Sequence, residues 1–230
     1  MDQALAALKT HLPDLSAVLD VGVHRCTPAL IKAFPDRFHY LFEPVVEFAP
    51  DIAKAYAGLE YELIPKAVSD GDGPGQQAYR FDTPSHDTVI ASQVVEGEFQ
   101  PRPKQSVRPV ERIRLDTFIH ERVLPGGLLL KVDVDGHEAA VLKGLERAAD
   151  RVDVLILETS LRDFPKRYAM VADLGFMIRD IVDLCYYFDT LAQVDLVCVR
   201  EDLFAQAGRS PFHEKDLDFR HWRRLTPTSA

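Results

Sequence analysis

A chain of 230 residues with 47% hydrophobic side chains suits one α/β domain that buries a sizeable core. The formal net charge of −9 makes nucleic acid a poor partner, because phosphate groups repel an acidic surface. The sequence has no apolar run of the roughly 20 residues that a membrane span requires, and no secretory signal is recognised at its start. Its three cysteines do not have the spacing of metal ligands. We therefore expect a cytoplasmic protein without a nucleic-acid or membrane partner.

Strand and helix patterns alternate along the chain. Apolar residues recur at helical spacing near the start and predict a short amphipathic helix within residues 1–14. Buried strands are predicted at 18–23, 39–44, 61–68, 128–134 and 152–158, and helices at 29–34, 45–56, 137–147 and 162–174. Two final strands, 176–181 and 194–199, have no clear helix between them and are expected to be antiparallel. This order predicts an α/β fold with a doubly wound, mostly parallel sheet.

Residues 70–110 interrupt the alternation, beginning with GDGPG and continuing with four prolines. So long a connection in a compact domain is either functional or disordered. We interpret it as an insertion or lid that carries a hairpin, formed by 80–81 and 89–90. The whole chain, 1–230, is then a single domain with a core at 15–200 and a tail at 201–230. The tail is expected to dock on the domain or on the second subunit of a homodimer.

The stretch VLDVGVHRC, residues 18–26, is a strand that runs into a turn. A dinucleotide-binding turn has the form Gly-x-Gly-x-x-Gly, and only Gly22 of the three glycines is present. An S-adenosylmethionine site needs less, because this cofactor has no pyrophosphate. It needs an acid before the turn, one glycine, and an acid at the end of the next strand for the two ribose hydroxyls. Asp20, Gly22 and Glu43 meet these needs, with Glu43 following Gly22 by the usual ~20 residues.

Polar residues alternate with valines at the end of the strand predicted at 128–134. Lys131, Asp133 and Asp135 should share one face, and a buried lysine needs a partner, for which Asp133 is placed. Asp135 and Glu138 have the spacing of a helix capping box, which favours a structural role for both. Asp133 instead should lie at the carboxyl end of the strand, beside the cofactor and the methyl acceptor.

Residues 128–145, LLLKVDVDGHEAAVLKGL, resemble the signature of FkbM-type methyltransferases, whose usual form is close to LLKIDVEGxExxVLKG. Other parts of that pattern follow the same order: LDVG at 19–22, FEP at 42–44, RLDTF at 114–118, LETS at 157–160 and VDLVCVR at 194–200. The resemblance covers roughly residues 15–200. It implies a Rossmann-like class I methyltransferase fold, S-adenosylmethionine as methyl donor, and O-methylation of a hydroxyl on a sugar or natural product.

The resemblance also implies which residues form the site. Asp20, Gly22 and Glu43 would hold the cofactor, and Asp133 would contact both cofactor and acceptor, with Glu138 and Glu158 near it. The first loop of the family usually reads DVGANxG, so His24 and Cys26 replace an asparagine and a glycine. We include His24 among the cofactor-binding residues, because an imidazole can donate to the cofactor carboxylate as an asparagine amide does.

A sugar hydroxyl is a poor nucleophile, so a base should assist the transfer. The candidate catalytic residues are Asp133, Glu158 and, within the insertion, His86. Mg²⁺ held by the carboxylates of this region is an alternative that their spacing does not favour, and no metal ligand is assigned. The expected partner is a small-molecule or glycan acceptor.

Two other functions compete with an active methyltransferase. One is a catalytically impaired binding protein of the same fold, whose cofactor loop is altered at His24 and Cys26. The other is a nicotinamide-dependent oxidoreductase, which the missing glycines disfavour.

Overall fold

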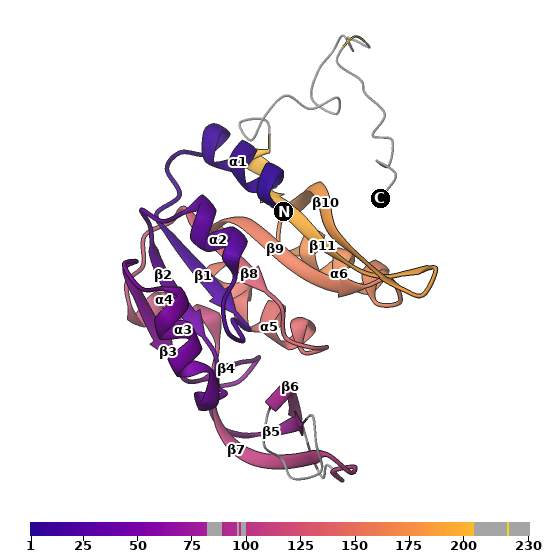
Figure 1. Cartoon of the computed structure of the whole chain (residues 1–230). Coiled ribbons are helices and arrows are strands. Elements are labelled where there is room, and N and C mark those ends of the chain that lie inside the picture. Colours follow the sequence, from indigo (N-terminus) through magenta and orange to yellow (C-terminus); the bar gives the residue numbers. More distant parts are fainter. Residues whose placement is uncertain (82–88, 96, 98–99, 205–219, 221–230) are drawn as a thin grey trace.

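A computed structural model describes residues 1–81, 89–95, 97, 100–204 and 220 (Figure 1). Its main sheet has seven strands in the order β10-β11-β9-β8-β1-β2-β3. Their bounds are Ala17–Val21 for β1, Phe38–Phe42 for β2, Tyr61–Ile64 for β3, Leu128–Val132 for β8, Val152–Ser160 for β9, Phe176–Tyr187 for β10 and Thr190–Arg200 for β11. Only β11 runs antiparallel to its neighbours, β9 and β10, so the predicted mostly parallel sheet with a final antiparallel pair is confirmed.

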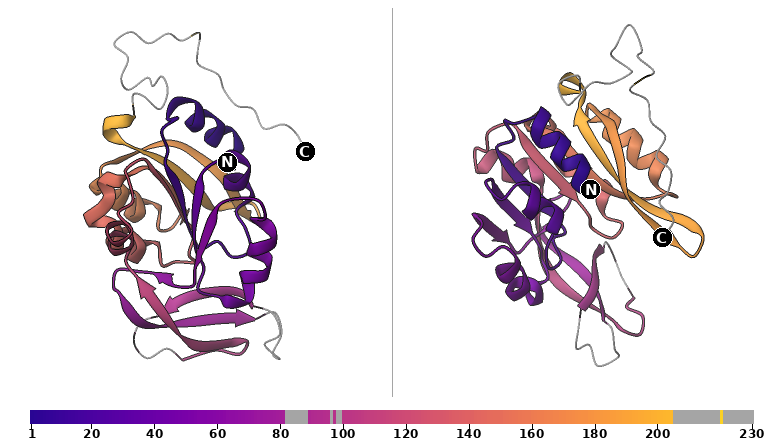
Figure 2. Two further views of the ribbon diagram at one scale, coloured as in Figure 1. Left: turned by 90° about the vertical axis from the view of Figure 1, so that its left-hand side faces the viewer. Right: turned by 45° about the horizontal axis from the view of Figure 1, so that its top comes forward.

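Helices cover both faces of this sheet, as a doubly wound fold requires (Figures 1 and 2). Helices α1 (Asp2–His11) and α2 (Pro28–Ala33) pack on one face, and α4 (Leu115–Glu121), α5 (Glu138–Leu145) and α6 (Phe164–Asp173) pack on the other. Strand residues alternate between the two cores: Val18 and Leu129 face the first group, whereas Leu19 and Leu130 face the second. Strands with two buried faces explain the continuous apolar runs in the sequence.

A second sheet of four strands, in the order β4-β7-β5-β6, contains most of the insertion. Its strands are β4 (Ala67–Val68), β5 (Gly73–Phe81), β6 (Val89–Val95) and β7 (Gln105–Ile113). The predicted hairpin exists but is longer than expected, and strand β7 was not foreseen. The single strand predicted at 61–68 is wrong: β3 ends before Pro65, which has no N–H for the ladder, and β4 joins the second sheet.

The insertion packs against the core beside the end of β1. Tyr79 of β5 and Val89 of β6 are buried together with Val23 and Phe48, which belong to loops that follow β1 and β2. Helix α3 (Ala49–Ala55), preceded by a short 3₁₀ segment (Val46–Phe48), contributes to the same cluster. Arg108 of β7 adds an ion pair to Glu47. Apolar packing and charge therefore dock the second sheet on the first.

The other predicted helices and strands agree with the structure to within a few residues, except that β10 continues to Tyr187, and helix α4 was not foreseen. Two further 3₁₀ segments occur at Glu146–Arg151 and Glu201–Leu203. Among the described residues, no helix is long and apolar enough to cross a membrane. His86 and nearly all of the predicted tail lie outside the described residues.

Candidate functional site

A cleft of about 520 Å³ opens where the parallel strands of the main sheet end and the second sheet begins. Its wall includes Gly22 and His24 after β1, Glu43 after β2, Asp133 after β8 and Glu158 within β9. Ligands of open α/β sheets bind beyond the carboxyl ends of the strands, and this cleft lies there. Of the candidate residues of the sequence, these five are brought together.

Glu43 is held in a fixed position at the edge of the cleft. Its side chain is 5% exposed, Oε2 accepts from the His24 N–H at 2.7 Å, and Oε1 accepts from the Val45 N–H at 2.9 Å. Burial raises the pKa of Glu43 to about 7, although the two N–H groups favour the charged form. Each oxygen keeps a second lone pair, so the carboxylate is able to accept two hydroxyl groups from a ligand.

The loop after β1 has the backbone conformation that its sequence pattern requires. Gly22 has φ of +85°, and a Cβ atom there would lie 1.8 Å from the carbonyl oxygen of Asp133, so only glycine fits. His24 has φ of +55°, a conformation in which asparagine and histidine are both enriched. Cys26 does not have a positive φ, so glycine is not required there for its backbone freedom.

The His24 ring packs edge-on against Phe48, with 4.3 Å between the ring centroids. Burial, with the charge of Arg25, lowers the pKa of His24 below its ordinary value. A neutral imidazole at the cleft wall is able to donate one hydrogen bond to a ligand and accept another. Its predicted contact with the cofactor carboxylate stays a prediction.

Asp20 differs from the other candidates, because it is fully buried in β1 and is not part of the cleft wall. Its Oδ2 accepts from the Tyr56 hydroxyl at 3.3 Å, and its Oδ1 has no hydrogen-bond partner. Burial raises the pKa of Asp20, and the charge of Lys131, its neighbour in the register of β1 and β8, opposes that shift. The acid of the LDVG motif thus faces the buried lysine, and a contact with the cofactor stays a prediction.

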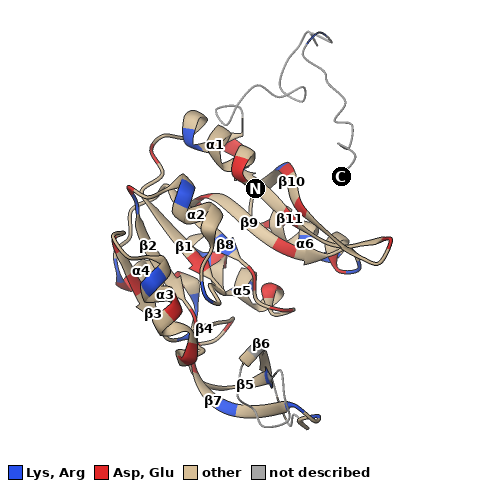
Figure 3. Ribbon diagram, viewed as in Figure 1, with Lys and Arg blue, Asp and Glu red and all other residues tan. Residues whose placement is uncertain are grey.

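Lys131 is paired as the sequence predicted: Nζ donates to Asp133 Oδ2 at 2.7 Å, and the residue is 6% exposed. Burial alone would lower the pKa of Lys131, but the charges of Asp20 and Asp133 outweigh it and raise the pKa. Acidic positions gather along this part of the main sheet (Figure 3). The lysine compensates a group of carboxylates that could not otherwise share one buried site.

Glu158 and Asp195 continue this acidic row onto β9 and β11, where register places them side by side. Burial raises the pKa of Glu158 to about 8, helped by the charge of Asp133 and a hydrogen bond with it. Burial also raises the pKa of Asp195 to about 6. Gln193 donates a hydrogen bond to Glu158 Oε1. At neutral pH, Glu158 is therefore mostly protonated, and it lies beside Asp133 in the cleft wall.

The start of α5 corrects the placement expected for Asp135 and shows the contacts of two residues that follow it. Strand β8 ends at Val132 and Asp135 has φ of +47°, so Asp135 belongs to the turn rather than to a shared strand face. His137 lines the cleft, and its Nε2 lies 2.9 Å from the Ser69 hydroxyl. Glu138 accepts from the Gly136 N–H at 2.7 Å and from Arg167 Nη2 at 2.9 Å. The structural role favoured for Glu138 is confirmed.

The far wall of the cleft comes from the insertion, which the sequence did not connect with particular residues. Gln77, 3% exposed, and Ser92 both line the cleft, and Gln77 Nε2 donates to Ser92 Oγ at 2.8 Å. Gln77 Oε1 is buried without a partner. Gln193 and Asp195 were missed as well, although Asp195 lies inside the quoted VDLVCVR motif. No pattern in the sequence marks Gln77.

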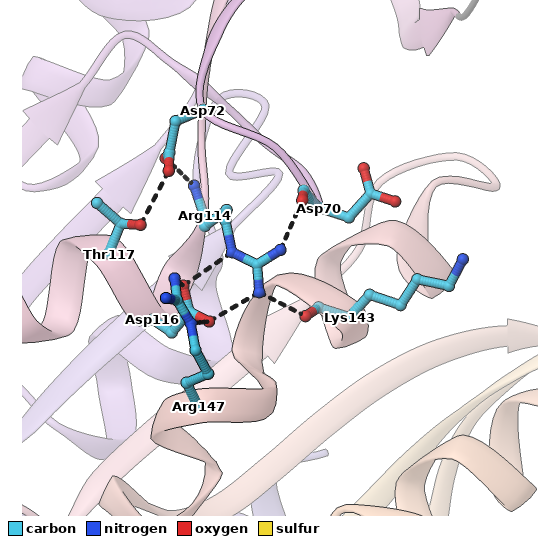
Figure 4. Close-up of polar contacts among 7 residues, drawn as sticks. All are labelled: Asp70, Asp72, Arg114, Asp116, Thr117, Lys143 and Arg147. Carbon is cyan, nitrogen blue, oxygen red and sulfur yellow. Dashed lines mark hydrogen bonds and ion pairs between the residues drawn. The ribbon is translucent and has the colours of Figure 1, made fainter.

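The RLDTF motif lies outside the cleft and forms a network of ion pairs (Figure 4). Asp116 is fully buried and accepts bidentate hydrogen bonds from Arg114 and Arg147, all between 2.8 and 3.0 Å. Arg114 also donates to the carbonyl oxygens of Asp70, at 2.6 Å, and Lys143, at 3.0 Å. The motif therefore fastens the start of the insertion to α4 and α5.

Burial alone would raise the pKa of Asp116, but the hydrogen bonds from the two arginines outweigh it and hold the pKa below its ordinary value. The carboxylate is thus charged at neutral pH. Its role is structural, because neither it nor its two arginines line the cleft.

The cleft suits S-adenosylmethionine in charge, size and donor set. Its volume falls within the roughly 300–1,000 Å³ of small-molecule sites, and its lining is rich in carboxyl groups that complement a sulfonium cation. Glu43 offers oxygens for vicinal hydroxyls. Among the described residues, no group of three His, Cys, Asp or Glu side chains is arranged to hold a metal ion.

Comparison with known proteins assigns the family. The solved structures that this chain resembles include a magnesium protoporphyrin IX methyltransferase from Synechocystis with bound S-adenosylmethionine, at 12% identity and a TM-score of 0.46, covering 86% of this chain and 77% of that one. Another is an rRNA methylase from Streptococcus thermophilus, at 13% identity and a TM-score of 0.48, covering 86% and 95%. A search of curated proteins finds no match.

The model of the FkbM methyltransferase domain matches residues 20–186, well over half of the chain. The match includes the loop after β1, the acid after β2 and the strand ends that carry Asp133 and Glu158. The resemblance suggested by the sequence motifs is confirmed, and the chain belongs to the FkbM methyltransferase family.

Proposed function

We propose that this FkbM-family methyltransferase is an S-adenosylmethionine-dependent O-methyltransferase that acts on a hydroxyl of a sugar or natural product. The observation that carries the proposal is the pair formed by Asp133 and Glu158 at the end of the acidic row. The pair lies in the same cleft as Glu43 and Gly22, and its Asp133 side chain is placed to accept the proton that a hydroxyl must lose.

Binding and chemistry divide between two parts of the cleft. Glu43 accepts the ribose hydroxyls, and the loop from Gly22 to Cys26 receives the amino acid end. When bound, S-adenosylmethionine supplies an electrophilic methyl group, and transfer breaks its carbon–sulfur bond, with the electron pair going to sulfur, as the carbon–oxygen bond forms. Asp133 orients the acceptor hydroxyl and takes its proton, and Glu158 lies beside Asp133. Alignment of the hydroxyl with the methyl group supplies much of the remaining rate.

The first experiment measures binding by calorimetry with S-adenosylhomocysteine and with NAD. We expect binding of the first and none of the second, because the loop after β1 has one of the three glycines of a dinucleotide turn. Absence of any heat or thermal shift with S-adenosylhomocysteine would refute the proposal.

The second experiment tests the chemistry with Asp133→Asn. Transfer of radiolabelled methyl from S-adenosylmethionine is measured over a panel of simple glycosides and phenols. We expect the variant to bind S-adenosylhomocysteine as wild type does and to lose at least 100-fold in turnover, within the range for removing a general base. Asp195→Asn, which removes the same charge from the same cleft, should lose far less. Equal losses would assign the effect to the cleft charge alone.

One alternative is an impaired binding protein of the same fold. It would bind S-adenosylhomocysteine and transfer methyl to no acceptor in the panel. The positive φ of His24 and the ordinary φ of Cys26 argue against it, because both replacements suit the backbone of the loop.

A further inference from the structure

Two walls enclose the part of the cleft that faces away from Glu43. One wall consists of the strand ends of the main sheet with Asp133, Glu158 and Gln193, and the other is the insertion with Gln77 and Ser92. The Asp133–Glu158 pair belongs to the first wall, and the insertion lines the same cleft, so a hydroxyl that loses its proton to Asp133 lies within reach of both walls.

A second, smaller cleft of about 290 Å³ continues from this region. The two clefts share Ser92, Asp135, Glu158 and Gln193. Besides Arg80 and four carboxyl groups, the second one is lined by carboxamides and hydroxyls, from Ser92, Gln93, Gln105, Thr159, Ser160 and Gln193. None of the described residues that line it is aromatic. Such a wall both donates and accepts hydrogen bonds, and it offers no stacking surface for a flat ring.

Gln77 gives an independent indication of the ligand. Gln77 is 3% exposed, and its Nε2 donates a hydrogen bond to Ser92 Oγ. This bond satisfies only one end of the carboxamide. The other end, Oε1, is buried without a partner, and Gln77 is one of the residues that line the cleft. A buried polar atom without a partner destabilises the protein, so a ligand group that completes this hydrogen bond would be favoured here.

The charge of the cleft narrows the class of acceptor. Six carboxyl groups line the larger cleft against two lysines, namely Glu43, Asp133, Asp135, Glu158, Asp183 and Asp195 against Lys66 and Lys131. An acceptor that carries phosphate or carboxylate would be repelled there.

We propose that the acceptor is a neutral, hydroxyl-rich molecule of the carbohydrate class, bound between the insertion and the strand ends, and that the free end of the Gln77 carboxamide hydrogen-bonds one of its hydroxyl groups. The inference rests on the proposed function. It narrows the acceptor from a sugar or natural product to a sugar. The insertion sheet is then the part of the chain that selects the acceptor.

The test uses the full chain, radiolabelled S-adenosylmethionine and three kinds of probe. Methyl glycosides of glucose, mannose, galactose and rhamnose represent neutral carbohydrates, catechol represents a flat phenol, and glucose 1-phosphate represents an anionic sugar. We expect transfer to at least one glycoside and none to the other two probes. Transfer only to catechol or glucose 1-phosphate, or to no glycoside by protein that binds S-adenosylhomocysteine, would overturn the inference. Protein that fails to bind S-adenosylhomocysteine would instead defeat the proposed function.

Gln77→Leu tests the residue itself. We expect kcat/KM for the active glycoside to fall at least tenfold while the affinity for S-adenosylhomocysteine stays within twofold, which also shows that the variant folds. Gln76→Leu is the matched control, because Gln76 is the exposed neighbour on the same strand and should behave as wild type. Wild-type kcat/KM in Gln77→Leu, or an equal loss of cofactor affinity, would contradict the assignment.

Deoxy analogues of the active glycoside identify the hydroxyl that Gln77 contacts. The analogue without that hydroxyl should be a poor substrate of the wild type and should lose little more on Gln77→Leu, because each change removes the same hydrogen bond. Fully additive losses for every deoxy analogue would show that Gln77 contacts none of the hydroxyls.

Discussion

Gly22→Ala isolates the closest approach in the cofactor loop. The new Cβ atom would lie 1.8 Å from the Asp133 carbonyl oxygen, so the two segments must separate by roughly 1 Å, which a close-packed interior resists. Alanine at φ of +85° adds about 1–2 kcal/mol of backbone strain. Overpacking adds about 1–3 kcal/mol, for a total loss of about 2–5 kcal/mol in the free energy of unfolding. For a chain of this size that lowers Tm by roughly 5–20 °C.

Gly58→Ala provides the control, because Gly58 has φ of +87° and nothing within 4 Å of the added Cβ atom. It should lose only the strain, about 1–2 kcal/mol, and keep wild-type affinity for S-adenosylhomocysteine. Gly22→Ala should also lose at least tenfold in that affinity, since it moves the loop that lines the cleft. Thermal melts and calorimetry measure both. Equal melting temperatures for the two variants would refute the reasoning, because the contact with Asp133 would then have no effect.

Three further changes test the charged groups. Asp116→Ala removes the carboxylate that two arginines share, and because both arginines reach solvent it should cost about 1.5–3 kcal/mol in a melt at pH 7. The pKa of Asp116 lies below its ordinary 3.8, so the deficit should shrink as pH falls below that value. The Tm of Glu158→Gln should exceed that of wild type at pH 9 and equal it near pH 4. The reason is that a pKa raised from 4.5 to about 8 stabilises the wild-type fold at low pH, and this contribution is lost as pH rises through 8. A difference in Tm that stays constant with pH would contradict the raised pKa. Glu43→Gln should weaken S-adenosylhomocysteine binding at least tenfold. Because the pKa of Glu43 is about 7, the affinity of wild type should rise as pH passes through that value, and the variant should lose this dependence on pH.

The main sheet and the cofactor side of the cleft were accessible from sequence because local patterns determine them. Strands such as β8 are buried on both faces and read as continuous apolar runs. Once parallel strands are recognised, their carboxyl ends must meet at one edge, which brings Gly22, Glu43 and Asp133 together. The predicted pair of Lys131 and Asp133 follows from the cost of burying one charge alone.

The acceptor side was not accessible because its contacts join distant segments. Glu138 is paired with Arg167, 29 residues away on another helix, and no periodicity reports such a partner. His137 turns into the cleft because Ser69, at the start of the insertion, supplies a hydroxyl. Strand β7 contains a proline and mixed polar residues, and it forms only because β5 pairs with it. Side chains whose orientation depends on tertiary partners cannot be assigned from spacing.

The two replacements in the first loop, His24 and Cys26, have different physical meanings. Position 24 needs a residue that tolerates positive φ, and histidine meets that need about as asparagine does. Position 26 has an ordinary φ, so a family glycine there reflects space next to the cofactor rather than backbone freedom. The effect of Cys26 therefore depends on the volume of its thiol within the cleft wall. The departure from the family pattern leaves the turn intact, so any change in cofactor affinity comes from the side chains of His24 and Cys26, which both line the cleft.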